Sequence, residues 1–129
     1  MIIGKGVLLL MALFFVSEEH QQAFEGAIEK ATAFVGGKGI QTPLYLLTSI
    51  PEVANNLEVV FNFTGGYINP DVIEEFNLST GQRIIFALAV NLYNGYVIED
   101  VELSPYQAMG WLSKEYRDVY LSAIGYRYC

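Results

Sequence analysis

Residues 83–93 place the strongest constraint on the fold, because this segment is apolar on nearly every side. A helix or strand without a polar face must be surrounded by the rest of the chain, so we expect it at the centre of the molecule. Ser79 precedes it and Gln82 follows three residues later, which is the capping-box pattern of a helix N-terminus. Asn94-Gly95 then either ends a helix or turns a hairpin. The capping box and the length favour a buried helix over a long buried strand.

Further helices are predicted on both sides of this segment. Ser17 is a favourable N-cap for a helix over residues 18–35, whose apolar residues recur at three- and four-residue spacing. A similar stripe predicts helix over about 105–124, and Ser113 inside it indicates a kink or a second cap. The remaining short helices are expected at about 70–76, after Asn69-Pro70-Asp71, and for one turn from Pro51.

Strands are expected at residues 43–48, 57–63 and 96–103 and, with more ambiguity, at 7–16. The last segment is ten apolar residues preceded by Lys5, which is also the outline of a retained signal or membrane anchor. Its length is about half a membrane span, so we favour a buried core element. These elements predict one helix-rich α+β domain over residues 1–129. An all-α fold is the alternative if the segments at 7–16 and 43–48 are helical.

The charge of the chain excludes some classes of partner. Seven Lys and Arg stand against 14 Asp and Glu, giving a net charge of −7, whereas nucleic-acid binding needs a basic face. A hydrophobic fraction of 53% excludes a disordered chain. Residues 39–113 hold eight acids and one base, Arg83. We interpret this acidic stretch as a solubilising surface, and a face for a basic partner is the alternative.

Histidine and cysteine each occur once, as His20 and Cys129. One of each does not make a transition-metal site or a disulfide framework. We expect His20 to be exposed in a first helical turn, where a catalytic base would not be oriented. A single terminal thiol suits a reducing compartment, so we expect a cytoplasmic protein without a cofactor.

The N-terminus of the central helix is a candidate anion-binding site. Small residues there leave backbone N–H groups available, and an arginine beside them pairs with a phosphate or carboxylate. The candidate residues are Ser79, Thr80, Gly81 and Arg83. The alternative, which we favour, is an ordinary capped helix whose arginine pairs with Glu74 or Glu75, because the chain has no phosphate-loop motif.

Two groups of acidic residues are candidates for a cation site or an acid–base pair. They are Asp71, Glu74 and Glu75, and Glu99, Asp100 and Glu102. Side chains alternate between the two faces of a strand, so the second group would not converge in the predicted strand. We therefore expect solvated faces and no metal site.

Tyrosine is concentrated near the C-terminus, where seven of nine fall in the last 37 residues. Aromatic residues with a polar tip are frequent at interfaces and in ligand pockets. We expect Tyr116 and Tyr120 to face the core and Tyr106, Tyr126 and Tyr128 to be exposed. The full candidate surface is Tyr93, Tyr96, Tyr106, Trp111, Tyr116, Tyr120, Tyr126 and Tyr128.

Three functions follow from these features. The first is a non-enzymatic module that binds a protein partner, or a second copy as a homodimer, through an aromatic surface with acidic surroundings. The second is a small-molecule binding protein with an aromatic-lined pocket of at least about 300 Å³ between the helix at 105–124 and the sheet. The third is a hydrolase or lyase that uses carboxylates such as Asp71, Glu74, Asp100 or Glu102, which requires at least two of them to be buried together.

Overall fold

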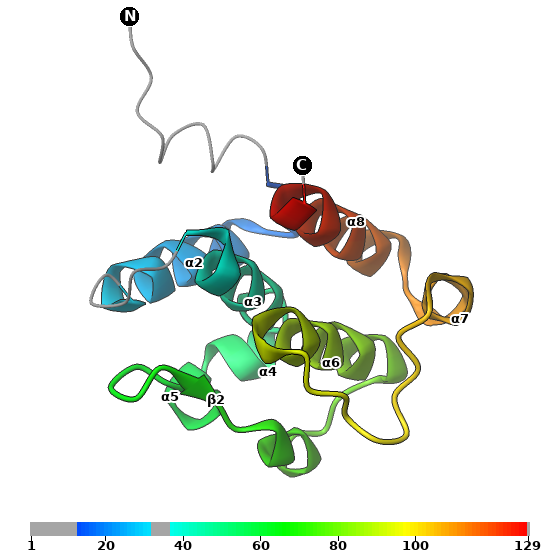
Figure 1. The fold of residues 1–129 in the computed structure, drawn as a ribbon. Coiled ribbons are helices and arrows are strands. Elements are labelled where there is room, and N and C mark those ends of the chain that lie inside the picture. Colours follow the sequence, from blue (N-terminus) through cyan, green and yellow to red (C-terminus); the bar gives the residue numbers. More distant parts are fainter. Residues whose placement is uncertain (1–12, 32–36, 129) are drawn as a thin grey trace, which may run out of the picture.

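A computed structural model describes residues 13–31 and 37–128, and these residues are mostly helical (Figure 1). The elements in chain order are α2 (Glu18–Lys30), α3 (Lys38–Thr48), α4 (Pro51–Ala54), α5 (Leu57–Val60), β1 (Phe61–Asn62), β2 (Tyr67–Ile68), the 3₁₀ helix η2 (Pro70–Glu75), α6 (Thr80–Asn94), α7 (Pro105–Trp111) and α8 (Lys114–Tyr128). The predicted strand at 7–16 lies mostly outside the described residues, and residues 13–16 form neither helix nor strand.

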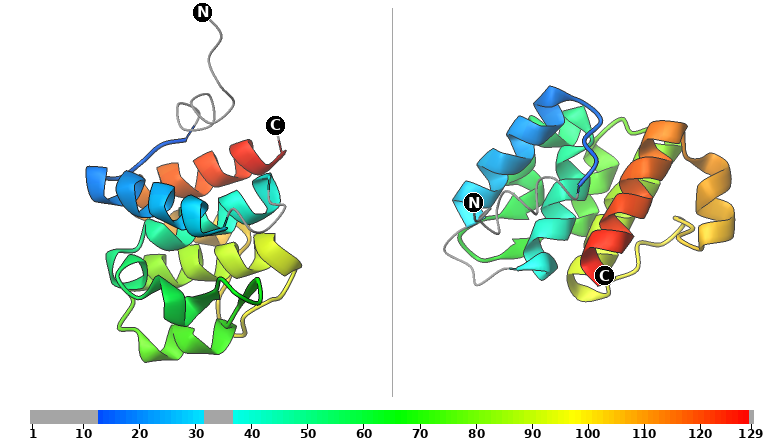
Figure 2. Two further views of the ribbon diagram at one scale, coloured as in Figure 1. Left: turned by 90° about the vertical axis from the view of Figure 1, so that its left-hand side faces the viewer. Right: turned by 90° about the horizontal axis from the view of Figure 1, so that it is seen from above.

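Helix α3 occupies the middle of the fold and packs against α2, α6 and α8. Seen from above, α2 and α8 flank α3, whereas α6 lies on another side of it (Figure 2). Every residue from 42 to 50 is buried, and so is every residue from 84 to 90 in α6. Two apolar helices therefore form the centre, and the other elements cover them.

The predicted central helix is confirmed as α6. Its N-terminus carries both hydrogen bonds of a capping box between Ser79 and Gln82. Its C-terminus ends at Gly95, which has a φ of 81° and donates its N–H to the Asn91 carbonyl at 2.7 Å. Glycine adopts this left-handed conformation without a steric cost, and no strand follows over residues 95–104, so Asn94-Gly95 is a helix cap and not a hairpin turn.

The predicted strand at 43–48 is wrong, because these residues belong to α3. An apolar run of this length fits a buried strand and a buried helix equally well by periodicity. The helix satisfies its own backbone groups in the interior, where a strand would need partners. The hydroxyls of Thr42 and Thr48 also donate to the carbonyls of Lys38 and Leu44, each at 2.7 Å, which satisfies buried polar side chains within the helix.

The other two predicted strands are also largely wrong. The segment 57–63 begins with α5, and only Phe61 and Asn62 form β1, which pairs antiparallel with β2. Residues 95–104 form neither helix nor strand. The amide of Tyr96 donates to the Asn94 side chain at 3.0 Å, so the chain turns away at the helix end. A sheet of two-residue strands fits both a helix-rich α+β description and an all-α one.

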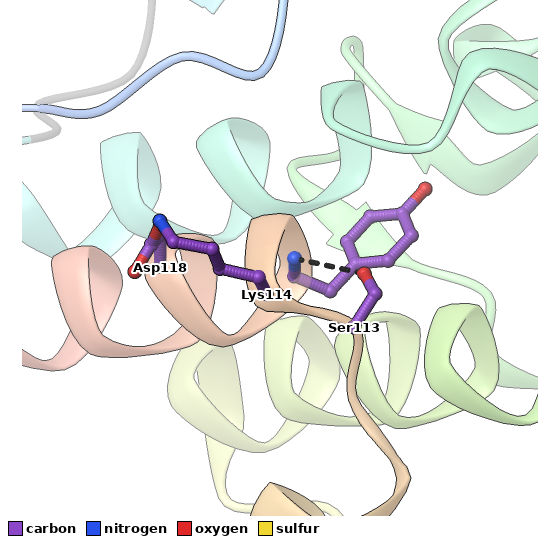
Figure 3. A network of polar contacts seen from close by, with 4 residues as sticks. Ser113, Lys114 and Asp118 are labelled. Atoms are coloured by element: carbon purple, nitrogen blue, oxygen red, sulfur yellow. Dashed lines mark hydrogen bonds and ion pairs between the residues drawn. The ribbon is translucent and has the colours of Figure 1, made fainter.

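The predicted break in the last helical region separates α7 from α8. Ser113 begins α8 by accepting the Tyr116 amide at 3.3 Å, and Lys114 pairs with Asp118 one turn further on (Figure 3). This confirms Ser113 as a second cap. None of the described helices combines the length and the apolar composition required to cross a membrane.

Replacing Leu46 with alanine tests the position of α3. Leu46 is fully buried, so we expect Leu46→Ala to lower the free energy of unfolding by about 2–5 kcal/mol. Leu121 on α8 is 57% exposed, and Leu121→Ala is the matched control with an expected change within about 0.5 kcal/mol. Urea denaturation midpoints measure both, and equal losses in the two variants would contradict this arrangement.

Candidate functional site

Four of the eight candidate aromatic residues support the fold through their hydroxyls. Tyr116 is half-buried and Tyr120 is buried, in agreement with the prediction that both face the core. Tyr126 is also buried, so its predicted exposure is wrong: it reaches α3, and Lys38 lies 5.2 Å from its ring centre. Each of the four hydroxyls donates one hydrogen bond: Tyr93 to the Gly66 carbonyl, Tyr116 to the Ser49 carbonyl, Tyr120 to the Leu103 carbonyl and Tyr126 to Gln41 Oε1.

The other four aromatic residues are exposed, and three of them lie in one segment. Tyr96, Tyr106 and Trp111 are 48%, 92% and 64% exposed, whereas Tyr128 lies apart at the end of α8. We name residues 95–112, which connect α6 to α8, the 95–112 arm. Its buried anchors are Ile98, Ala108 and Leu112. These side chains and the hydrogen bond from Tyr120 to the Leu103 carbonyl hold the arm, which presents Tyr96, Tyr106 and Trp111 to solvent.

A pocket of about 390 Å³ lies between the 95–112 arm and η2. It brings residues of the two acidic groups together, which the sequence did not predict. Residues 96–100 are irregular, so Glu99 and Asp100 line the same pocket and the alternation expected of a strand does not apply. The lining residues are Pro70, Asp71, Ile73, Glu74, Tyr96, Val97, Ile98, Glu99 and Asp100.

The pocket combines carboxylates with exposed apolar side chains. Asp71, Glu74, Glu99 and Asp100 are all exposed residues. Val97 beside Tyr96 is 64% exposed. Val97 is not among the residues predicted from sequence, and the available signal was its position between an aromatic residue and two acids. Open carboxylates around apolar side chains suit ion pairing with a ligand better than proton transfer, which needs a shielded group.

Residues of the candidate anion site contact other residues of this chain. Arg83 pairs with Glu74 at 3.0 Å, as predicted for an ordinary capped helix without an anion site. The Ser79 hydroxyl accepts the Gln82 amide as the helix cap, and Thr80 is the first residue of α6. Gly81 is buried, and a Cβ built there would lie 3.5 Å from the Trp111 carbonyl oxygen. The end of α7 therefore covers part of this helix terminus.

His20 is buried, so the predicted exposure is wrong. The segment before α2 folds back over the ring, and the Val16 amide donates to Nδ1 at 3.2 Å. The proton is then on Nε2, which donates to the Tyr45 carbonyl at 2.9 Å. Burial lowers the pKa of His20 to about 4, and the bond to Tyr45 opposes this shift in part. The ring is a neutral structural link between α2 and α3.

The ring of Tyr45 extends this link to α8. Its hydroxyl donates to the Phe14 carbonyl, and the Phe14 amide donates to Ser122 Oγ at 3.1 Å. Burial raises the pKa of Tyr45 to about 12, so the phenol keeps its proton. Ser17, the hydroxyl nearest to His20 in sequence, is used as the cap of α2 and accepts the His20 amide at 3.0 Å. These groups connect helices and do not form a nucleophile and base.

The described residues contain no group of three or more His, Cys, Asp or Glu side chains placed to hold a metal ion. The model of one protein family matches residues 11–129, which include every described helix and strand. The chain belongs to the family DUF6075. This family is described as one of unknown function. No curated protein and no solved structure matches the chain.

The DUF6075 match covers both α2 and α3, so the His20 link lies within the family region. The titration of His20 can be measured through the stability of the fold. The pKa of His20 is about 6.5 in the unfolded chain and about 4 in the fold, so the unfolded state binds the extra proton between these values. The contribution of the neutral His20 ring to the free energy of unfolding is fully present above about pH 6.5. It falls as the pH drops to about 4, with a total loss on the order of 3 kcal/mol.

Replacing His20 with glutamine separates this titration from that of the carboxylates. His20→Gln retains a donor for the Tyr45 carbonyl but binds no proton. Denaturation at several pH values should show a smaller loss of stability between about pH 6.5 and 4 in the variant than in the native chain. Parallel pH profiles for the two proteins would show that His20 does not titrate as a buried neutral ring.

Proposed function

We propose that this DUF6075 protein is a non-enzymatic module that binds a basic segment of another protein between the 95–112 arm and η2. The observation that carries the proposal is the pocket of about 390 Å³ that is lined both by four acidic residues and by the exposed Tyr96 and Val97. Aromatic residues are the most frequent hot spots of protein interfaces, and complementary charge directs encounter with the partner.

The charges of this region favour a basic partner. The 95–112 arm carries three acids and no Lys or Arg. Glu74 already pairs with Arg83 at 3.0 Å, which leaves Asp71, Glu99 and Asp100 as the carboxylates for an arginine of a partner. The apolar stems of Lys and Arg cover apolar surface while the charged groups reach carboxylates, and Tyr96 offers a ring face for a cation.

A protein partner is favoured over the two other functions. None of the four pockets described in this chain, at about 210, 310, 390 and 480 Å³, is lined by a residue of α7 or α8, where the aromatic ligand cavity was expected. Acid–base catalysis requires buried carboxylates, whereas the four that line this pocket are exposed. As part of the proposal we place the protein in the cytoplasm, since its one cysteine suits a reducing compartment.

Titration with tetra-arginine, followed by amide chemical shifts in two-dimensional NMR, tests the pocket. We expect shifts concentrated at residues 70–74 and 96–100, an affinity that falls with added salt, and no response to tetra-glutamate. The variant Asp71→Asn, Glu99→Gln, Asp100→Asn should lower the affinity about tenfold, since three partly screened pairs each contribute about 0.5 kcal/mol.

The matched control is the variant Glu18→Gln, Glu19→Gln, Glu115→Gln, which removes the same number of charges from helices outside the pocket. Its affinity for tetra-arginine should stay within about twofold of the native chain. An equal loss in both triple variants would reduce the effect to net charge and would contradict the proposed site. Shifts at the 95–112 arm that depend on protein concentration without peptide would assign the surface to a second copy.

A further inference from the structure

The dipeptide Asn94-Gly95, which ends α6, has a chemical property beyond its role as a cap. Seven asparagines occur in the chain, and Asn94 alone is followed by glycine. The amide nitrogen of the next residue can attack the side-chain carbonyl of an asparagine, and a glycine offers the least steric hindrance because it has no Cβ. The sequence therefore places the most reactive asparagine of the chain at the junction between α6 and the 95–112 arm.

The native cap holds both reacting groups away from this reaction. The nucleophile, the Gly95 amide, donates to the Asn91 carbonyl at 2.7 Å. The electrophile is the side-chain carbonyl of Asn94, whose oxygen accepts the Tyr96 amide at 3.0 Å. The Asn91 side chain donates to the carbonyls of Gly95 and Tyr96, each at 3.4 Å, and so closes the turn from the other side.

We propose that Asn94 is a site of spontaneous deamidation whose rate is set by opening of the last turn of α6. When the Gly95 amide is released it loses its proton to solvent hydroxide, and its nitrogen forms a bond to Cγ of Asn94. Ammonia leaves as the Cγ–Nδ2 bond breaks, which gives a five-membered succinimide. Water then opens the ring to aspartate or isoaspartate, so the net change is addition of water and loss of ammonia without any oxidant or reductant.

The product changes the junction in two ways. Either acid adds a negative charge at the C-terminal end of α6, where the helix dipole disfavours it. Isoaspartate also adds a methylene group to the main chain between α6 and Gly95, which removes the geometry of the left-handed cap. Both products therefore weaken the attachment of the 95–112 arm at its first residue. This inference does not depend on the proposed binding function.

Peptide mapping by mass spectrometry tests the proposal on the full chain in mildly alkaline buffer, with and without urea. We expect conversion at Asn94 to exceed that at the other six asparagines in urea, and to be at least about tenfold slower in the folded protein. A tenfold ratio corresponds to an opening free energy of about 1.4 kcal/mol. No conversion at Asn94 in urea, or equal rates in the two states, would overturn the proposal.

The variant Gly95→Ala separates chemistry from opening. A Cβ at residue 95 slows the attack in urea, whereas the positive φ of 81° makes alanine costly in the closed cap. The ratio of the folded rate to the urea rate should therefore rise about fivefold or more, even though both rates are lower. An unchanged ratio would show that the cap does not control the reaction.

Discussion

The packing of α3 against α6 determines where the other elements of this fold must lie. Both helices are buried along most of their length, so neither has a polar side to offer to water. A helix pairs its backbone groups internally, although Pro43 in α3 has no N–H to donate, and the hydroxyls of Thr42 and Thr48 donate to carbonyls of α3. A chain of 129 residues has limited interior, and placing two helices there commits every other element to covering them.

The covering elements are joined to this pair by a few polar links. His20 and Tyr45 connect α2 and the segment before it to α3, and Ser122 continues the connection to α8. The 95–112 arm has no regular structure over its first ten residues and is held by three buried side chains and by the hydrogen bond from Tyr120 to the Leu103 carbonyl. It presents aromatic and acidic side chains together to solvent, which is why we propose the binding function there.

The helices that carry their own start and stop signals were predictable from sequence. The capping box at Ser79, the left-handed Gly95 and the second cap at Ser113 are local signals, and the structure contains all three. Residues 43–48 and the burial of His20 depend on contacts with distant parts of the chain, and no local pattern reports these. For the candidate site, the sequence named Tyr96 and the two acidic groups, but their meeting in one pocket follows from the irregular path of residues 95–104.

Hydrogen–deuterium exchange of the backbone amides can distinguish a buried α3–α6 pair from the elements that cover it, because it reports local opening along the whole chain. The slowest amides should lie in α3 and in residues 84–90 of α6, at or near the free energy of global unfolding. Amides of residues 96–106 should exchange by local opening at a much lower free energy. Protection of the 95–112 arm equal to that of α6, or exchange of α3 before α2 and α8, would contradict a two-helix centre with an exposed arm.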